Sequence, residues 1–326
     1  YYAENLLEEI TRPGEWYVNR STGMLYFWPP APLAGADIWV SLLEQPLWRL
    51  KDTTHVVVRD ITLDMGRADL VAIEGGTRNA FIHCTLRNAG NYAGRVSGTS
   101  NGVSSCVISH TGEGGIALSG ASSRATLVPV RNFIRNCDVR DFSRWSWTYQ
   151  PAALINPEAV GCWVSHNSMH DSPHTAILFG RCNDNTIEFN HVGNVCTWSS
   201  DAGAIYIGRD WGARGNVIRH NFVHDVDSLF EGYGTHGIYL DDCQSGVQVF
   251  GNVLYRISDN AIMMGGGRDN LMENNVIARC GTGIAADGRG TGWMFTGGGS
   301  SNLWADLQRY PYQGALWSNA YPLCAA

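Results

Sequence analysis

The sequence predicts a right-handed parallel β-helix, an all-β solenoid whose rungs stack along one axis and share one core. Three observations predict it. A motif of a small polar or Cys residue, any residue and an aliphatic residue recurs eight times along the chain. A short apolar strand follows most of these motifs. Glycine is abundant, at 38 of 326 residues, and charged residues make up only 16%, which suits many turns and few charged helix faces.

The repeated motif has the spacing of a solenoid. Its steps along the chain are 22, 31, 30, 23, 31, 31 and 23 residues, so a rung takes about 22 residues and some rungs carry seven to nine more. Stacked side-chain amides can hydrogen-bond the rungs above and below at the strand spacing of ~4.8 Å, and Cys fits the same small inward position. Unrelated strands of a sandwich are the alternative. The repeated positions are Cys84, Cys106, Cys137, Asn167, Asn190, Asn221, Asn252 and Asn275.

A second strand in each rung is predicted to point its central Ile or Leu inward and the next residue outward. The outward residues on two adjacent rungs are Tyr206 and Tyr239. The motif lies 9 or 10 residues before the central residue in four rungs and 15 to 17 residues before it in three. The longer rungs predict enlarged loops at one corner, where solenoids usually build a binding face. The predicted central residues are Ile116, Leu154, Ile177, Ile205, Ile238, Ile262 and Ile284. The enlarged loops carry Trp145, Trp147, Trp198, Asp201, Glu231 and His236.

The two ends of the chain depart from the repeat. Residues 1–50 contain two apolar runs around a Gly-containing turn, which predicts a β-hairpin element packed on the solenoid. Residues 51–290 form the predicted β-helix domain. Residues 291–326 predict an irregular tail with one helix near residues 303–308. Because the chain does not begin with Met and ends without a closing element, we expect a piece of a longer protein.

The composition argues against several kinds of partner. The net charge is −7 and Lys51 is the only lysine, so neither nucleic acid nor an anionic membrane would find a basic surface. No apolar run of 18 residues predicts a transmembrane span. The nine Cys have no paired spacing, which predicts buried thiols rather than a disulfide framework. We expect a monomer.

No metal or cofactor is predicted. His and Cys are spread along the rungs instead of clustering with ligand spacing. The Asp-rich loops could take calcium, but they contain no calcium-binding motif. No Gly-rich loop of the phosphate-binding kind lies between a strand and a helix.

Two segments on adjacent rungs point to carbohydrate chemistry, which needs aromatic platforms and carboxylates. Asp201 precedes its strand, whereas Asp241 and Asp242 follow theirs, so the carboxylates can cooperate only if the loop before Ala202 folds back over the outer face. The candidate catalytic residues are Asp201, Asp242 and Asp241. The candidate substrate-binding residues are His236, Tyr206, Tyr239, Arg209, His174, Trp145, Trp147 and Trp211.

Each candidate also has a structural interpretation. Asp before Ala or Gly commonly forms a turn, which applies to Asp201, and the Asp pair could be a solvated corner. Tyr206 and Tyr239 could pack only against each other. The histidines and Arg209 could be structural hydrogen-bonding groups, and the tryptophans could simply cover the solenoid.

Residues 4 to about 293 resemble the β-helix enzymes of glycoside hydrolase family 141. The resemblance lies in residues 4–9 (ENLLEE) with 13–17 (PGEWY), residues 201–206 (DAGAIY), residues 236–242 (HGIYLDD) and residues 287–290 (DGRG). β-Helix repeats alone would be weak evidence, since unrelated activities share them. The first and last of these segments lie outside the repeat and therefore add specificity.

The resemblance implies hydrolysis of plant cell-wall glycans, by an α-L-fucosidase or a xylanase, and an extracellular or periplasmic location. Two aspartates on neighbouring rungs are the catalytic pair that it implies. They correspond to Asp201 and Asp242 here, with Asp241 as the competitor for the second place. Family members generally have more β-helix on both sides of the segment that this chain represents.

Three functions remain open on the sequence. The first is a glycoside hydrolase in which one Asp protonates the leaving oxygen and the other activates water or attacks the anomeric carbon. The second is a polysaccharide lyase or uronate epimerase, which would need an Arg, His or Tyr base because the sole lysine lies outside the repeat. The third is a non-catalytic solenoid that binds glycans through Trp145 or Trp211.

Overall fold

The computed structural model describes residues 4–120, 124–230, 232–292, 294 and 303–325. The chain forms two compact units, Tyr1–Ser41 and Leu42–Ala326. The first unit contains the predicted hairpin, in which β1 (Trp16–Asn19) pairs antiparallel with β2 (Met24–Phe27), preceded by the 3-10 turn η1 (Leu7–Glu9). The side chain of Asn5 accepts a hydrogen bond from the backbone N–H of Val18 at 2.8 Å and donates one to its carbonyl at 3.1 Å.

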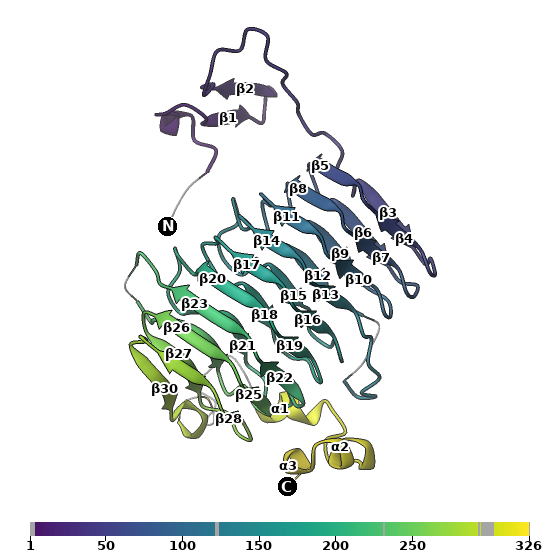
Figure 1. Cartoon of the computed structure of the whole chain (residues 1–326), viewed down its shortest axis with the longest axis vertical. Helices are drawn as coiled ribbons and strands as arrows, with labels where there is room; N and C mark the ends of the chain where they lie inside the picture. Colours follow the sequence, from purple (N-terminus) through teal and green to yellow (C-terminus); the bar gives the residue numbers. More distant parts are fainter. Residues whose placement is uncertain (1–3, 121–123, 231, 293, 295–302, 326) are drawn as a thin grey trace. The chain divides into compact units, whose positions relative to one another are not determined.

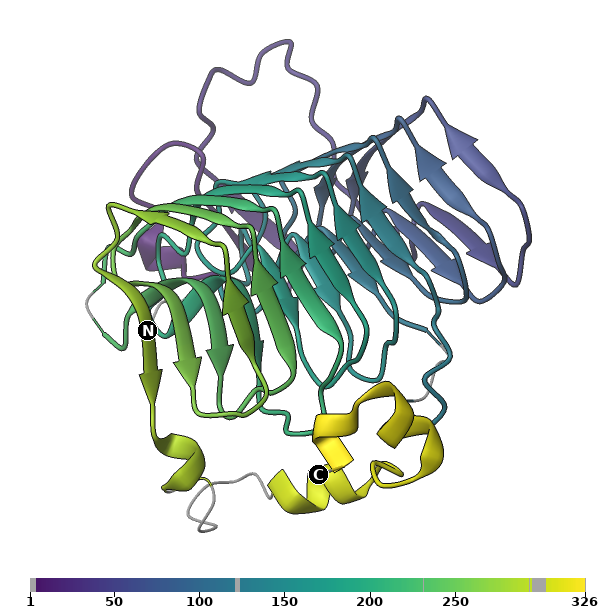
Figure 2. The ribbon, with the colours of Figure 1, turned by 60° about the horizontal axis from the view of Figure 1, so that its bottom comes forward.

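The second unit is the predicted parallel β-helix, in which each rung adds one strand to each of three parallel sheets (Figures 1 and 2). Sheet 1 contains, in spatial order, β4 (Val57–Arg59), β7 (Ala80–Ile82), β10 (Gly102–Ser104), β13 (Phe133–Arg135), β16 (Trp163–Ser165), β19 (Thr186–Glu188), β22 (Asn216–Arg219), β25 (Val247–Phe250) and β28 (Leu271–Glu273).

The other two sheets repeat this parallel order. Sheet 2 contains β5 (Thr62–Gly66), β8 (Thr85–Ala89), β11 (Val107–Ser109), β14 (Asp138–Arg140), β17 (Ser168–His170), β20 (His191–Val195), β23 (Phe222–Val226), β26 (Val253–Ile257) and β29 (Val276–Ala278). Sheet 3 contains β3 (Trp48–Lys51), β6 (Val71–Glu74), β9 (Gly94–Val96), β12 (Ile116–Leu118), β15 (Ala153–Ile155), β18 (Ile177–Phe179), β21 (Ala202–Gly208), β24 (Thr235–Asp241), β27 (Asn260–Gly265) and β30 (Thr282–Asp287).

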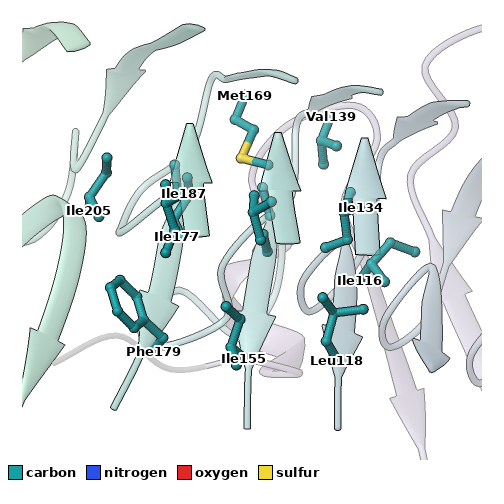
Figure 3. Packing of buried hydrophobic residues seen from close by; sticks show 14 of the residues in the cluster. Ile116, Leu118, Ile134, Val139, Ile155, Met169, Ile177, Phe179, Ile187 and Ile205 are labelled. Atoms are coloured by element: carbon teal, nitrogen blue, oxygen red, sulfur yellow. The ribbon is translucent and has the colours of Figure 1, made fainter. Parts of the chain in front are cut away.

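The core runs along the axis of the helix because the same face of each strand points inward in every rung. Leu118, Ile155 and Phe179 pair in register on sheet 3 and form one row of buried side chains (Figure 3). Burying a side chain of this kind contributes roughly 1.5–3 kcal/mol. Stacking therefore lets each short strand gain from its neighbours an apolar contact that it could not make alone.

The predicted column of small polar residues is confirmed at the corner between sheets 1 and 2. Asn221 Nδ2 donates to Asn252 Oδ1 at 3.0 Å, and its own Oδ1 accepts from Asn190 Nδ2 at 3.0 Å. Asn167 bonds Asn190 in the same way, and Asn252 bonds Asn275. The column continues through buried cysteines, since the backbone N–H of Cys137 donates to Asn167. All nine cysteines are free thiols and eight are buried, which confirms the prediction for Cys84, Cys106 and Cys137 in the repeated position.

A second asparagine column was not predicted, although its signal is present in the sequence. It lies just before the sheet 1 strands, where Asn79 Nδ2 donates to Asn101 Oδ1 at 3.2 Å and Asn185 Nδ2 donates to Asn216 Oδ1 at 3.0 Å. Asn79, Asn101 and Asn185 each immediately precede a strand, and Asn216 is the first residue of β22. The spacing of the second column therefore follows that of the first. The two columns satisfy buried backbone groups at two corners of each rung.

The prediction for one inward residue is wrong. Ala153, not Leu154, pairs with Ile116 and Ile177, and Leu154 pairs with Leu178. Leu154 is therefore on the outer face of sheet 3, where it is half-buried. The error arose because apolar residues occupy both positions, and a shift of one residue exchanges the two faces of a strand.

The C-terminal segment returns to the solenoid. α1 (Leu303–Gln308) forms where a helix is predicted, and α2 (Ala315–Ala320) and α3 (Pro322–Ala325) follow it. Trp317 donates from Nε1 to the carbonyl of Arg124 at 2.9 Å, and the Tyr321 hydroxyl donates to Asp184 at 2.7 Å. Arg124 itself forms a buried ion pair with Asp210 at 2.8 Å. These contacts hold the segment against the corner between sheets 3 and 1.

Candidate functional site

A cleft of about 660 Å³ lies on the outer face of sheet 3, over its C-terminal rungs. Seven of the eleven predicted site residues line this cleft together. They are Asp201, Tyr206, Arg209, His236, Tyr239, Asp241 and Asp242. Further lining residues that were not predicted include Tyr149, Tyr233, Asn260, Met263, Asp287 and Arg289.

Two stacked tyrosines connect the carboxylates of the cleft. Tyr206 and Tyr239 pair in register on β21 and β24, and their rings stack at 5.2 Å. The Tyr206 hydroxyl donates to Asp241 Oδ2 at 2.7 Å, while the Tyr239 hydroxyl donates to Asp201 Oδ1 at 3.3 Å. These crossed bonds bring the carboxylate before β21 and the carboxylate that ends β24 to the same pair of rings. Asp201 adopts a left-handed backbone conformation, with φ of 54°.

Asp241 is a buried carboxyl group that reaches the cleft. It ends β24 opposite Gly208, and only 5% of the residue is exposed. Burial raises the pKa of Asp241, and the neighbouring Asp242 raises it further, although hydrogen bonds from Tyr206 and Tyr239 and the charge of Arg289 oppose the shift. The net shift is upward, which is the direction that an acid catalyst requires.

Asp242 is engaged by two arginines. Arg209 Nε donates to its Oδ2 at 2.6 Å, and Arg289 Nη1 donates to its Oδ1 at 2.9 Å. The same Arg289 nitrogen also donates to Asp241 Oδ1 at 2.8 Å, and Nη2 donates to Asp287 at 2.6 Å. One guanidinium group thus lies among three carboxyl groups and fixes the position of the Asp pair.

Arg289 and Asp287 belong to the site, although neither was predicted as a site residue. Asp287 ends β30 and Arg289 begins the 3-10 turn η2 (Arg289–Thr291). Their signal was residues 287–290, which contribute to the family resemblance. The spacing of the repeat could not place Arg289, because it lies beyond the last regular strand and turns back across two rungs to reach Asp241.

His236 borders the cleft as a buried side chain. Its Nδ1 accepts a hydrogen bond from Asn260 Nδ2 at 3.2 Å, and its ring meets Tyr239 edge-on at 4.6 Å. Burial lowers the pKa of His236, and the negative charges of Asp259 and Asp201 partly offset this shift. With Nδ1 as an acceptor, the ring proton resides on Nε2.

Four of the predicted substrate-binding residues do not line the cleft. His174 is buried behind Tyr149, with ring centroids 4.8 Å apart, and burial lowers the pKa of His174 to about 4. Trp145 donates from Nε1 to the carbonyl of Gly90 at 2.6 Å. Trp147 packs edge-on against Trp198 at 5.0 Å, and Trp211 packs against Trp304 at 5.6 Å. Glu231, also named in the enlarged loops, lies outside the described residues.

Within the residues that the structure describes, no group of three or more His, Cys, Asp or Glu side chains is arranged to hold a metal ion. In the cleft itself, the cationic groups paired with the carboxyl groups are Arg209 and Arg289. No helix in the described part of the chain has the length and apolar character needed to cross a membrane.

Comparison with known proteins agrees with this architecture. A family model described as a right-handed β-helix region matches residues 95–277. A solved structure described as a glycoside hydrolase superposes with a TM-score of 0.64 at 17% sequence identity, over 86% of this chain and 57% of that protein. This chain therefore spans little more than half the length of that relative, and the likeness is one of fold. A search of curated proteins finds no match. Because the family model covers more than half of the sequence, the chain belongs to the right-handed β-helix family.

Proposed function

We propose that the chain is a glycoside hydrolase in which Asp241 is the general acid and Asp201 is the base or nucleophile. The observation that carries the proposal is the meeting of these two carboxyl groups at one cleft through the crossed bonds of Tyr206 and Tyr239. Glycoside hydrolysis requires one carboxyl group that is protonated and another that is ionised. The two carboxyl groups also differ in exposure, since Asp241 is buried and Asp201 is exposed.

The two aspartates are suited to different roles. Burial raises the pKa of Asp241, so this group can hold the proton that the leaving glycosidic oxygen takes. Asp201 is exposed at the mouth of the cleft, where its carboxylate can activate a water molecule or attack the anomeric carbon. Tyr239 fixes one oxygen of Asp201 and leaves the other available.

Asp242, which the family resemblance places first, fits a positioning role better. Both of its oxygens accept hydrogen bonds from guanidinium groups. Its function in this account is to hold Arg209 and Arg289, and Arg289 in turn holds Asp241. A direct role for Asp242 would require at least one of these charge-assisted bonds to break.

Several contacts favour hydrolysis over a lyase or epimerase at the same cleft. Those reactions need a base and a cation that neutralises a uronate carboxylate. Burial raises the pKa of both Tyr206 and Tyr239, so these phenols stay protonated and are poor bases. Arg289 is already surrounded by Asp241, Asp242 and Asp287, which leaves its charge compensated by the protein.

The proposed substrate is a plant cell-wall polysaccharide or its oligosaccharides, cleaved at an α-L-fucosyl or a xylosyl linkage by an extracellular or periplasmic monomer. Support for this choice comes from the resemblance to glycoside hydrolase family 141. The fold shared with a solved glycoside hydrolase agrees with it.

The test is an activity panel of aryl α-L-fucosides, aryl β-xylosides, xylans and pectic glycans, with released sugar as the readout. The variants are Asp201→Asn and Asp241→Asn. Asp227→Asn is the matched control, because Asp227 is exposed and does not line the cleft. We expect the first two variants to lose activity and the control to keep it. Unchanged turnover in both cleft variants, or an unsaturated product absorbing in the ultraviolet, would refute the hydrolase assignment.

A further inference from the structure

The cleft continues along sheet 3 into a second hollow of about 490 Å³ over earlier rungs. Tyr149, Tyr206 and Arg209 line both spaces, so the two spaces adjoin. The second hollow, here called the groove, lies over β15, β18 and β21, which are neighbours in the sheet (Figure 1). Its remaining lining residues are Leu154, Ile155, Pro157, Leu178, Phe179, Gly180, Arg181 and Gly208.

The floor of the groove is the outward column that ends at the stacked tyrosines. Leu154 pairs with Leu178, which pairs with Tyr206, which pairs with Tyr239. Two residues further along each strand, three successive rungs carry Gly180, Gly208 and Asp241 at the same position. A Cβ at Gly208 would lie 3.2 Å from the Asp241 Cβ. The two glycines thus keep a ledge open beside an apolar floor, as the ring face of a sugar requires.

The wall of the groove is a column of charged residues at the corner that follows the strands. Arg181 and Arg209 each follow the ledge glycine of their rung and share a left-handed backbone, with φ of 52° and 62°. Asp242, with φ of 40°, occupies the same place in the next rung. Arg209 is neutralised by Asp242. Among the described residues, no carboxylate forms an ion pair with Arg181, which is exposed.

The charges of the two spaces are therefore opposite. The cleft contains four aspartates and two arginines, all six of which are lining residues. The groove contains Arg181 and Arg209 and no acidic residue. The buried carboxylate of Asp210 is paired with Arg124 and also experiences the positive charge of Arg181. An anion in the groove would meet the guanidinium group of Arg181, which forms no ion pair among the described residues, beside apolar surface.

We propose that the groove is a subsite for an anionic sugar residue of the substrate and that Arg181 binds its acidic group. This inference rests on the proposed function, since it assigns the substrate class of the same site. Arg181 and Asp242 are two rungs apart, or roughly 10 Å at the strand spacing. The acidic residue is therefore a different sugar from the one whose bond Asp241 protonates, and the substrate is an acidic oligosaccharide rather than an isolated glycoside.

The test is binding of Asp241→Asn protein to an array of neutral, uronate-bearing and sulfated oligosaccharides, with a carboxyl-reduced partner for each uronate. Arg181→Gln is added to this background as the subsite variant. Arg131→Gln is the matched control, because Arg131 is also exposed and has a left-handed backbone, with φ of 57°, outside the groove. The uronate and sulfate arms identify which acidic group is bound.

We expect at least one acidic oligosaccharide to bind ten-fold or more tightly than its neutral counterpart, and to lose this preference with Arg181→Gln or at high salt. Retention of neutral glycans only, an acidic preference that survives Arg181→Gln, or no retention at all would overturn the subsite. The two proposals can fail separately. An acidic oligosaccharide that binds through Arg181 and that unmutated protein leaves uncleaved would keep the subsite and refute the hydrolase.

Discussion

The asparagine ladder and the outer face of sheet 3 belong to the same rungs, yet they differ in how they use repetition. At the ladder, Asn167, Asn190, Asn221 and Asn252 make the same side-chain bond in four successive rungs. On the outer face of sheet 3, the corresponding column changes from Leu to Tyr to Met as it crosses the cleft. Positions that repeat hold the solenoid together, and positions that stop repeating carry the proposed chemistry.

The largest effect is expected on activity, from a substitution in the cleft, where the outer face of sheet 3 stops repeating. Asp241→Asn keeps the shape of the side chain but removes the transferable proton, so kcat/KM should fall by about 10²–10⁴-fold. The measurement is steady-state hydrolysis of the best substrate, with circular dichroism to confirm folding. A loss of less than ten-fold would move the acid role away from Asp241.

A large effect on stability is expected where the repetition holds. Asn221→Ala removes the acceptor for the backbone N–H of Asn190 and the donor to the carbonyl of Ile187. Leaving such buried groups unpaired costs about 1–3 kcal/mol each, so the free energy of unfolding should fall by about 3 kcal/mol. Gln248→Ala, at an exposed position of β25, should change it by less than about 0.5 kcal/mol. If chemical denaturation gave the same loss of stability for both variants, the proposed structural role of the ladder would be wrong.

The free energy of unfolding should depend on pH through the buried His174, whereas the asparagines of the ladder do not titrate. Burial lowers the pKa of His174 to about 4 in the folded state, against about 6.5 in the unfolded chain. The unfolded state therefore binds an additional proton between these values, so stability is present above pH 6.5 and falls as the pH approaches 4. The expected loss is about 3 kcal/mol. His174→Gln should flatten this part of the stability profile, and an unchanged slope would exclude His174 as its source.

The smallest effect is expected from one bond of the tyrosine pair. Tyr206→Phe removes a hydrogen bond that lowers the pKa of Asp241, so that pKa should rise further. The general acid then stays protonated to higher pH, and the alkaline limb of the kcat/KM profile should move upward, with a loss of about ten-fold or less at the optimum. Tyr255→Phe, which lies on sheet 2, is the control. An alkaline limb that stays in place or moves downward contradicts the assignment.

The sequence predicted the solenoid well because its evidence is repeated. The ladder asparagines recur with an aliphatic residue two positions later, and each recurrence supports the others. Leu154 was misplaced because the long loop before it removed the spacing that fixes register elsewhere. The site was predicted less completely, since Asp201 reaches Tyr239 only through a local left-handed backbone. Arg289 reaches across rungs to Asp241 and Asp242, and these contacts depend on the stacking rather than on any local pattern.

The central claim is that burial raises the pKa of the Asp241 carboxyl group, so that this group can supply the proton for hydrolysis. The most direct measurement is a ¹³C NMR titration of carboxyl-labelled aspartates in the unmutated chain and in the Asp241→Asn variant. The account predicts a carboxyl resonance that titrates above the ordinary range for aspartate and is missing from the variant. If the resonance lost in Asp241→Asn titrates at or below that range, Asp241 is a carboxylate like its neighbours and cannot be the acid.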